Sequence, residues 1–164
     1  MSKFKKNPLK LKFLEQFPIS SLASSDIRSR CKFNLSFFDD SQQHGSAFDA
    51  LDSATLSDIL SKIKAFTRND LNYWRNERCG GSGLKIFTDY TSFPKKSNFS
   101  FPKYIPHDVR WGRFRLENLM RLVGFTIPGA FENNDKTNNQ PYDMNTFYLV
   151  FIDLEHNFYI SEKK

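Results

Sequence analysis

The fold class follows from residues 111–127, which read WGRFRLENLMRLVGFTI. Apolar and polar residues alternate over residues 111–116, which is the period of a strand with one buried face. Residues 117–118, Glu-Asn, suit a tight turn, and the apolar run over residues 120–127 is typical of a second strand. The segment therefore predicts an antiparallel hairpin.

Further strands are expected on both sides of this hairpin. Residues 146–152, TFYLVFI, are β-branched, aromatic or aliphatic throughout and form the strongest strand signal in the chain. Alternating Phe and Leu predict a strand over residues 32–37, and residues 84–87 are expected to form a short strand. Residues 157–160 are expected to pair back on the strand at 146–152.

Two helices are expected between the first strand and the hairpin. Apolar residues recur at helical spacing from Leu56 to Phe66. Thr55 and Asp58 are predicted to form a capping box at the start of this helix. A second helix is expected over residues 70–78, before a glycine-rich exit. This order indicates an α+β fold, with two helices packed on a curved, mainly antiparallel sheet. A doubly wound parallel sheet is disfavoured because the later strands lack helical crossovers.

The net charge of +6 is concentrated at one end of the 164-residue chain. Residues 1–32 hold eight basic and two acidic residues, and the remainder holds sixteen of each. We therefore predict a basic N-terminal arm at residues 1–31, followed by a single α+β domain at residues 32–164. Insertions are expected within that domain at residues 84–109 and 128–145.

The chain is expected to be cytoplasmic. Its first residues are basic but lack the continuous apolar stretch of a signal peptide, and no apolar run approaches the roughly 18 residues of a membrane span. Cys31 and Cys79 are expected to be free thiols in a reducing compartment. Neither they nor the three histidines have metal-ligand spacing, so we expect no metal and no cofactor.

Residues 91–109 combine prolines, aromatic residues and lysines, and the prolines exclude regular ladders. Aromatic rings among lysines are typical of single-stranded nucleic-acid binding, in which bases stack on the rings. Alternatively, the rings anchor a long loop to the core. The 18 Phe residues spread along the chain favour this second interpretation.

The densest basic segment after the arm is residues 93–127, with seven basic and two acidic residues. Strand alternation places Arg113 and Arg115 on one face, and the hairpin brings Arg121 close to them. Three guanidiniums on one face would form a phosphate-binding surface. A solvated face balanced by acidic residues from the helices is the alternative. The residues expected to contact RNA, if RNA is the partner, are Arg110, Arg113, Arg115, Lys95, Lys96, Lys103 and His107.

His156 follows the strongest predicted strand, with Asp153, Glu155 and Tyr159 nearby in sequence. Histidine has a pKa near neutral pH and can act as a general acid or base in RNA cleavage. A lone histidine at a strand end is more often a surface residue, so spacing alone leaves this role open.

The C-terminal half resembles a known family. The run Arg113-Phe-Arg-Leu116, followed after four residues by Arg121-Leu-Val-Gly-Phe125, resembles the arginine-bearing central strands of RelE-type toxins. A final strand leading into His156-Asn-Phe-Tyr159 is similar to the C-terminal end of some members. The resemblance covers residues 111–160 in sequence and residues 32–78 in element order only.

This resemblance implies a small metal-independent endoribonuclease that cleaves mRNA, commonly on the ribosome, and is held inactive by a cognate antitoxin. It implies a catalytic role for Arg121, phosphate contacts from all three arginines, a general acid or base in His156, and a place in the site for Tyr159. The chain departs from the family in its basic arm and two insertions. It also has two carboxylates just before His156, which would repel RNA unless arginines pair with them.

Our leading hypothesis is a bacterial or phage-type RNA-binding, toxin-like protein with endoribonuclease activity. A second hypothesis is a non-catalytic accessory protein of a defence or mobile-element system that binds nucleic acid or protein. A third is a small-molecule enzyme with an arginine-lined anionic pocket. The residues alone leave open whether the protein is an enzyme, and no membrane partner is expected.

Overall fold

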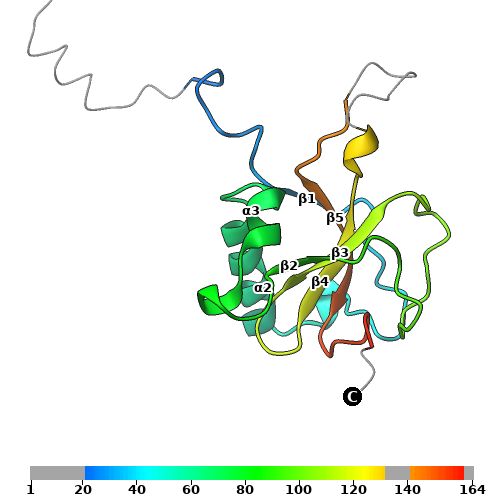
Figure 1. The fold of residues 1–164 in the computed structure, drawn as a ribbon. Coiled ribbons are helices and arrows are strands. Elements are labelled where there is room, and N and C mark those ends of the chain that lie inside the picture. The colour runs from blue at the N-terminus through cyan, green and yellow to red at the C-terminus, as the bar shows by residue number, and fades with distance from the viewer. Residues whose placement is uncertain (1–20, 132–140, 161–164) are drawn as a thin grey trace, which may run out of the picture.

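The computed structural model describes residues 21–131 and 141–160, and in them five strands form one mixed sheet. The strand order is β1-β5-β4-β3-β2 (Figure 1). β1 runs parallel to β5, and the other three neighbouring pairs are antiparallel. The elements are β1 Lys32–Asn34, η1 Phe48–Ala50, α2 Ser53–Phe66, α3 Leu71–Asn76, η2 Cys79–Gly81, β2 Phe87–Asp89, β3 Arg110–Arg115, β4 Arg121–Thr126, η3 Gly129–Phe131 and β5 Thr146–Asp153.

The helices α2 and α3 cover one side of the sheet, which we call the helix face (Figure 1). Each helix begins after an aspartate whose carboxylate accepts an amide of the first turn: Asp52 from Thr55 at 2.8 Å and Asp70 from Tyr73 at 2.6 Å. The buried residues between helices and sheet are Cys31, Ile59, Phe66, Leu71, Phe87, Phe114, Leu116, Leu122, Phe147, Leu149 and Ile152.

The other side of the sheet, which we call the loop face, is covered by the chain between β2 and β3. Phe93 packs edge-on against Trp111 at 4.9 Å between ring centroids, and Phe99 packs on Phe151 at 4.5 Å. These rings form a second buried cluster around Phe158. The interpretation in which the aromatic residues anchor a long loop to the core is therefore confirmed.

Several sequence predictions of element bounds need correction. The capping box at Thr55 and Asp58 is wrong, because α2 starts at Ser53 and Asp52 is its cap. β1 ends at Asn34, since the Asn34 side chain accepts the Ser36 amide at 2.8 Å and turns the chain. The short strand expected at residues 84–87 is instead β2, which begins at Phe87.

Residues 157–160 do not pair back on β5. The Ile160 amide donates to the carbonyl of Lys96 at 3.1 Å, and the Asn98 amide donates to the carbonyl of Asn157 at 3.0 Å. The last described residues are therefore bound to residues 96–98 of the chain between β2 and β3.

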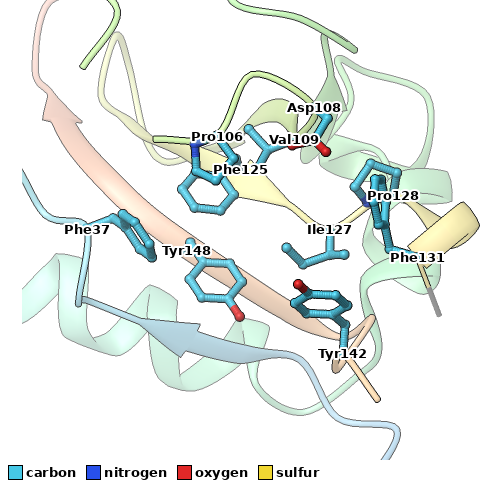
Figure 2. Close-up of a pocket in the computed structure, with 10 residues that line it drawn as sticks. All are labelled: Phe37, Pro106, Asp108, Val109, Phe125, Ile127, Pro128, Phe131, Tyr142 and Tyr148. Atoms are coloured by element: carbon cyan, nitrogen blue, oxygen red, sulfur yellow. The ribbon is translucent and has the colours of Figure 1, made fainter. Parts of the chain in front are cut away.

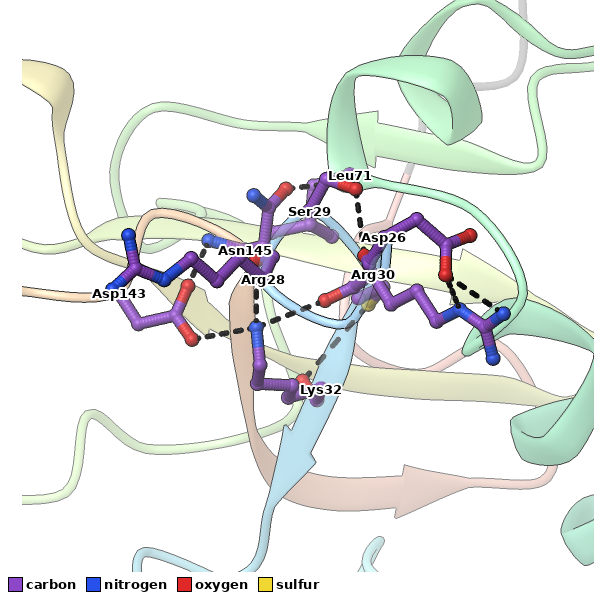
Figure 3. A network of polar contacts seen from close by, with 9 residues as sticks. Asp26, Arg28, Ser29, Arg30, Lys32, Leu71, Asp143 and Asn145 are labelled. Carbon is purple, nitrogen blue, oxygen red and sulfur yellow. Dashed lines mark hydrogen bonds and ion pairs between the residues drawn. The ribbon is translucent and has the colours of Figure 1, made fainter. Parts of the chain in front are cut away.

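The segment before β1 is held by Lys32 (Figure 3). Its Nζ donates to the carbonyls of Arg28 at 3.0 Å and Arg30 at 3.1 Å, and lies 2.8 Å from Asp143 Oδ2. The Asp143 pair is partly exposed and contributes at most about 1 kcal/mol. Of the predicted basic arm, residues 1–20 lie outside the described residues.

Cys31 and Cys79 are both free thiols, as predicted. The first is buried, and burial raises the pKa of its thiol to about 12. Within the described residues, no helix is long and apolar enough to cross a membrane.

The close approach of β4 and β5 yields a test of the fold. A Cβ at Gly124 would collide with the carbonyl oxygen of Tyr148, beside the irregularity between Val123 and Gly124. We expect Gly124→Ala to lower the free energy of unfolding by more than about 3 kcal/mol, measured by urea denaturation. Gly129→Ala is the control, since nothing lies within 4 Å of its Cβ. Equal stabilities of the two variants would contradict the β4–β5 register.

Candidate anion-binding site

Arg113, Arg115 and Arg121, which we call the arginine cluster, lie on the loop face where β3 joins β4. Arg115 and Arg121 are cross-strand partners. Arg113 and Arg115 alternate with Phe114, which is buried under the helices. The predicted meeting of the three arginines is thus confirmed. The side chains are less exposed than a solvated face would require, because Arg113 is 9% exposed and Arg121 only 2%.

Arg113 and Arg121 are each held by only part of the guanidinium. Arg121 Nη1 donates to the carbonyls of Asn118 at 3.0 Å and Met120 at 2.6 Å, within the β3–β4 turn. Arg113 Nε donates to the hydroxyl of Tyr90 at 2.8 Å. These bonds fix the guanidiniums in place and leave other donors of the same groups available.

The remaining donors are the most unusual feature of the site. Five buried side-chain nitrogen or oxygen atoms of the described residues lack a hydrogen-bond partner, and three belong to the cluster: Arg113 Nη1, Arg115 Nε and Arg121 Nε. An unsatisfied buried donor costs about 1–3 kcal/mol, and more when it is charged. No described carboxylate forms an ion pair with the cluster. An anion with several acceptor oxygens would satisfy these donors.

The electrostatics of Arg121 agree with this geometry. Burial, with the charges of Arg113 and Arg115, lowers its pKa to about 10. Burial and the Arg113 charge also lower the pKa of Arg115. The folded protein therefore carries a concentrated positive charge with little compensation from nearby acids.

Asp153 is the nearest candidate counter-charge, yet its oxygens are already bonded. It is the cross-strand partner of Arg121 and fully buried. Its carboxylate accepts the backbone amides of Glu155 at 3.2 Å, Asn157 at 3.0 Å and Phe158 at 2.9 Å. Asp153 therefore shapes the turn that carries His156, and its carboxylate does not face outward.

His156 stands at this turn with a φ of 63° and is half-buried. Burial lowers its pKa below 6.5, and the charges of Arg121 and Arg113 lower it further, while Asp153 acts in the opposite direction. The imidazole is therefore within electrostatic range of the cluster and neutral at pH 7. A neutral imidazole can accept a proton.

Two tyrosines complete the site. Tyr90 and Tyr159 stack with ring centroids 5.0 Å apart and an interplanar angle of 3°. Burial raises the pKa of Tyr90, although Arg113 opposes this shift. Tyr159 is 43% exposed, so the stacked pair reaches from the buried arginine to the surface.

Not every residue predicted to contact RNA joins the cluster. Arg110 lies on the opposite face of β3, where its Nε is 3.0 Å from Asp89 Oδ2. His107 stacks on Phe101 at 4.6 Å, within the loop. Lys95, Lys96 and Lys103 are exposed on the loop.

An apolar pocket of about 190 Å³ lies away from the cluster, toward the other ends of β4 and β5 (Figure 2). Its lining includes Phe37, Phe125, Tyr142 and Tyr148, and its one charged group is Asp108. With a carboxylate and no cationic side chain, this pocket does not suit an anion.

Tyr90 and Asp153 were missed as site residues by sequence reasoning. Tyr90 follows β2, two residues after Thr88, the cross-strand partner of Arg113. A correct start for β2 would have placed Tyr90 on the arginine face. The expectation that Asp153 would repel RNA assumed an exposed carboxylate, and no signal in the sequence showed its burial.

No group of three or more potential metal ligands occurs in the described part of the chain. Comparisons with protein-family models, with curated proteins and with solved structures found no match.

Inorganic phosphate should stabilise the protein through the cluster. A ligand that binds only the folded state at about a hundred times its Kd adds about 2.7 kcal/mol. We expect phosphate to raise the Tm of the wild type, and to raise it less in Arg121→Gln. Arg68→Gln, an exposed change outside the cluster, is the control. An equal response of both variants would exclude the cluster as the phosphate site.

The titration of His156 tests the coupling between the imidazole and the cluster. Its NMR midpoint should lie below 6.5 in the wild type and rise in Arg121→Gln, because the largest charge that lowers its pKa is removed. Added phosphate should also raise the midpoint. A midpoint that is the same in wild type and variant would show that Arg121 and His156 are not coupled.

Proposed function

We propose that the arginine cluster binds a phosphate of the RNA backbone and that the protein is an endoribonuclease of RelE-like type. The observation that carries the proposal is the set of buried, unpartnered nitrogens on Arg113, Arg115 and Arg121. Guanidinium donors without a protein partner match the tetrahedral oxygens of phosphate.

The surroundings of the cluster favour a polynucleotide substrate. The exposed ring of Tyr159, backed by Tyr90, offers a surface for a base to stack on. Lys95 and Lys96 are exposed in the segment that hydrogen-bonds to residues 157–160. A base on Tyr159 and neighbouring phosphates near these lysines would accompany a phosphate held by the arginines.

The chemistry needs no metal. His156, neutral at pH 7, accepts the proton of the ribose 2′-OH, whose oxygen then forms a bond to phosphorus. The arginines stabilise the charge that develops on the phosphorane. The bond from phosphorus to the 5′-oxygen breaks, and the Tyr159 hydroxyl supplies the proton to that oxygen. The products are a 2′,3′-cyclic phosphate and a 5′-OH end.

The family resemblance supports the same function. Strand, two helices and antiparallel strands follow one another in the order that the resemblance implies. Under this proposal the substrate is mRNA, commonly on the ribosome, and a cognate antitoxin is the protein partner in the cytoplasm.

One observation favours a second candidate. Arg113 and Arg121 are almost completely buried, which suits a small anionic metabolite better than a wide polymer groove. Such a metabolite would reach the arginines beside Arg115 and His156, which are partly exposed.

The decisive experiment is RNA cleavage by purified protein, free of any antitoxin, with ribosomes supplied. We expect His156→Asn to lower the cleavage rate by 10²-fold or more, the order of a lost general base. Asparagine tolerates the positive φ at this position, so the variant should fold. Arg121→Gln should also abolish cleavage, and Tyr159→Phe should reduce it.

His44→Ala is the matched control, since His44 packs beside Phe99 and lies outside the site. Intact RNA with wild-type protein and ribosomes would refute the ribonuclease. If RNA then still bound in an Arg121-dependent way, the non-catalytic binding protein would be supported. If only small phosphorylated compounds bound, the metabolite enzyme would be supported.

A further inference from the structure

A second basic site lies near the β2 edge of the sheet, on the opposite face from the arginine cluster. It is a groove of about 610 Å³ that is lined by α3, β2 and β3 and by residues just after β4 and just before β5. Its volume lies within the size range of ligand sites. Three cationic side chains line it, from three different segments: Arg75 on α3, Lys85 before β2, and Arg110 on β3. We call it the basic groove.

Asp89 is the single acidic residue that lines the groove. Arg110 Nε lies 3.0 Å from Asp89 Oδ2, and Arg75 Nε lies 3.9 Å from the same oxygen. The other oxygen of Asp89 accepts the amide of Thr91 at 2.9 Å. One carboxylate therefore orients two guanidiniums and leaves the groove with a net charge of +2.

The arginines of the groove are partly immobilised and still able to bind. Arg75 packs over the Phe87 ring, with Cζ 5.5 Å from the centroid. Both guanidiniums contact Asp89 through Nε, and their Nη atoms form no hydrogen bond within the described part of the chain. Lys85 is exposed and forms no ion pair with a described carboxylate.

The two sites lie on opposite faces of the sheet and share strand β3, which carries Arg110 of the groove and Arg113 of the cluster. Side chains of a strand alternate between faces, so Thr88 and Tyr90 lie toward the arginine cluster while Phe87 and Asp89 lie toward the helix face. The Tyr90 hydroxyl accepts a hydrogen bond from Arg113 of the cluster, and the Asp89 carboxylate accepts one from Arg110 of the groove. Thr88 itself lines the groove and is the cross-strand partner of Arg113. A chain passing around the edge of β2 can therefore contact both sites.

We propose that the basic groove binds a second phosphate of the same single-stranded RNA, a few nucleotides from the phosphate held by the arginine cluster. This inference rests on the proposed function for its choice of ligand. The groove extends the RNA footprint from the loop face around β2 to the helix face, and so requires an RNA longer than the cluster alone would need.

The test measures binding of a trinucleotide and a decanucleotide by fluorescence anisotropy over a range of salt concentrations. Both are 2′-O-methyl RNA, which cannot be cleaved. Arg75→Gln/Lys85→Gln should weaken decanucleotide binding about tenfold and reduce its salt slope by about one. Trinucleotide binding should not change. Lys64→Gln/Arg68→Gln, which removes the same charge from exposed positions at the end of α2 and just after it, should change neither.

The single variant Lys85→Gln controls for folding, because Lys85 is exposed and makes no packing contact like that of Arg75 with Phe87. It should show a smaller loss in the same direction. If Arg75→Gln/Lys85→Gln bound the decanucleotide like its control, the inference would be wrong while the proposed function stood.

Other outcomes separate the two proposals. If Arg121→Gln changed neither oligonucleotide while the groove variant weakened the decanucleotide, the groove would remain and the proposed function would fail. If adenosine monophosphate bound in a groove-dependent way and RNA did not, the groove would be a nucleotide site and the inference would be overturned.

Discussion

The burial of β4 on both faces is the constraint on which the site depends. β4 lies between β3 and β5, and all six of its residues are buried. Arg121 is the first of them, so the same packing that forms the core also removes a guanidinium from water. The turn carbonyls of Asn118 and Met120 compensate part of that cost, and the rest remains as unpartnered donors. The fold thus holds a positive charge that it does not neutralise.

The elements that could be predicted from the sequence are those with a clear local period. The hairpin of β3 and β4, the strand β5 and the two helices follow from apolar spacing, and the hairpin register then brings the arginines together. The ends of helices and strands are harder to predict where a side-chain hydrogen bond sets them. The cap at Asp52 and the turn after Asn34 are examples. The cover of the loop face could be anticipated only from the abundance of phenylalanine.

The site was predictable to the extent that it follows strand alternation. Arg110 shows the limit of charge counting, because it belongs to the same basic segment as Arg113 but points to the opposite face. The places of Tyr90 and Asp153 depend on long-range packing, and so does that of Arg75, which lines the groove from α3. Local sequence patterns do not predict which residues distant in sequence the sheet order brings together.

The shortness of β1 and β2 has a consequence for self-association. These are the two edges of the sheet, and each has three residues. A long flat edge presents a row of unpaired backbone groups that recruits strands from other copies and promotes aggregation. Here each edge exposes too few such groups to template an extended ladder. The β-rich core can therefore carry many aromatic residues without offering neighbouring molecules a continuous strand to join.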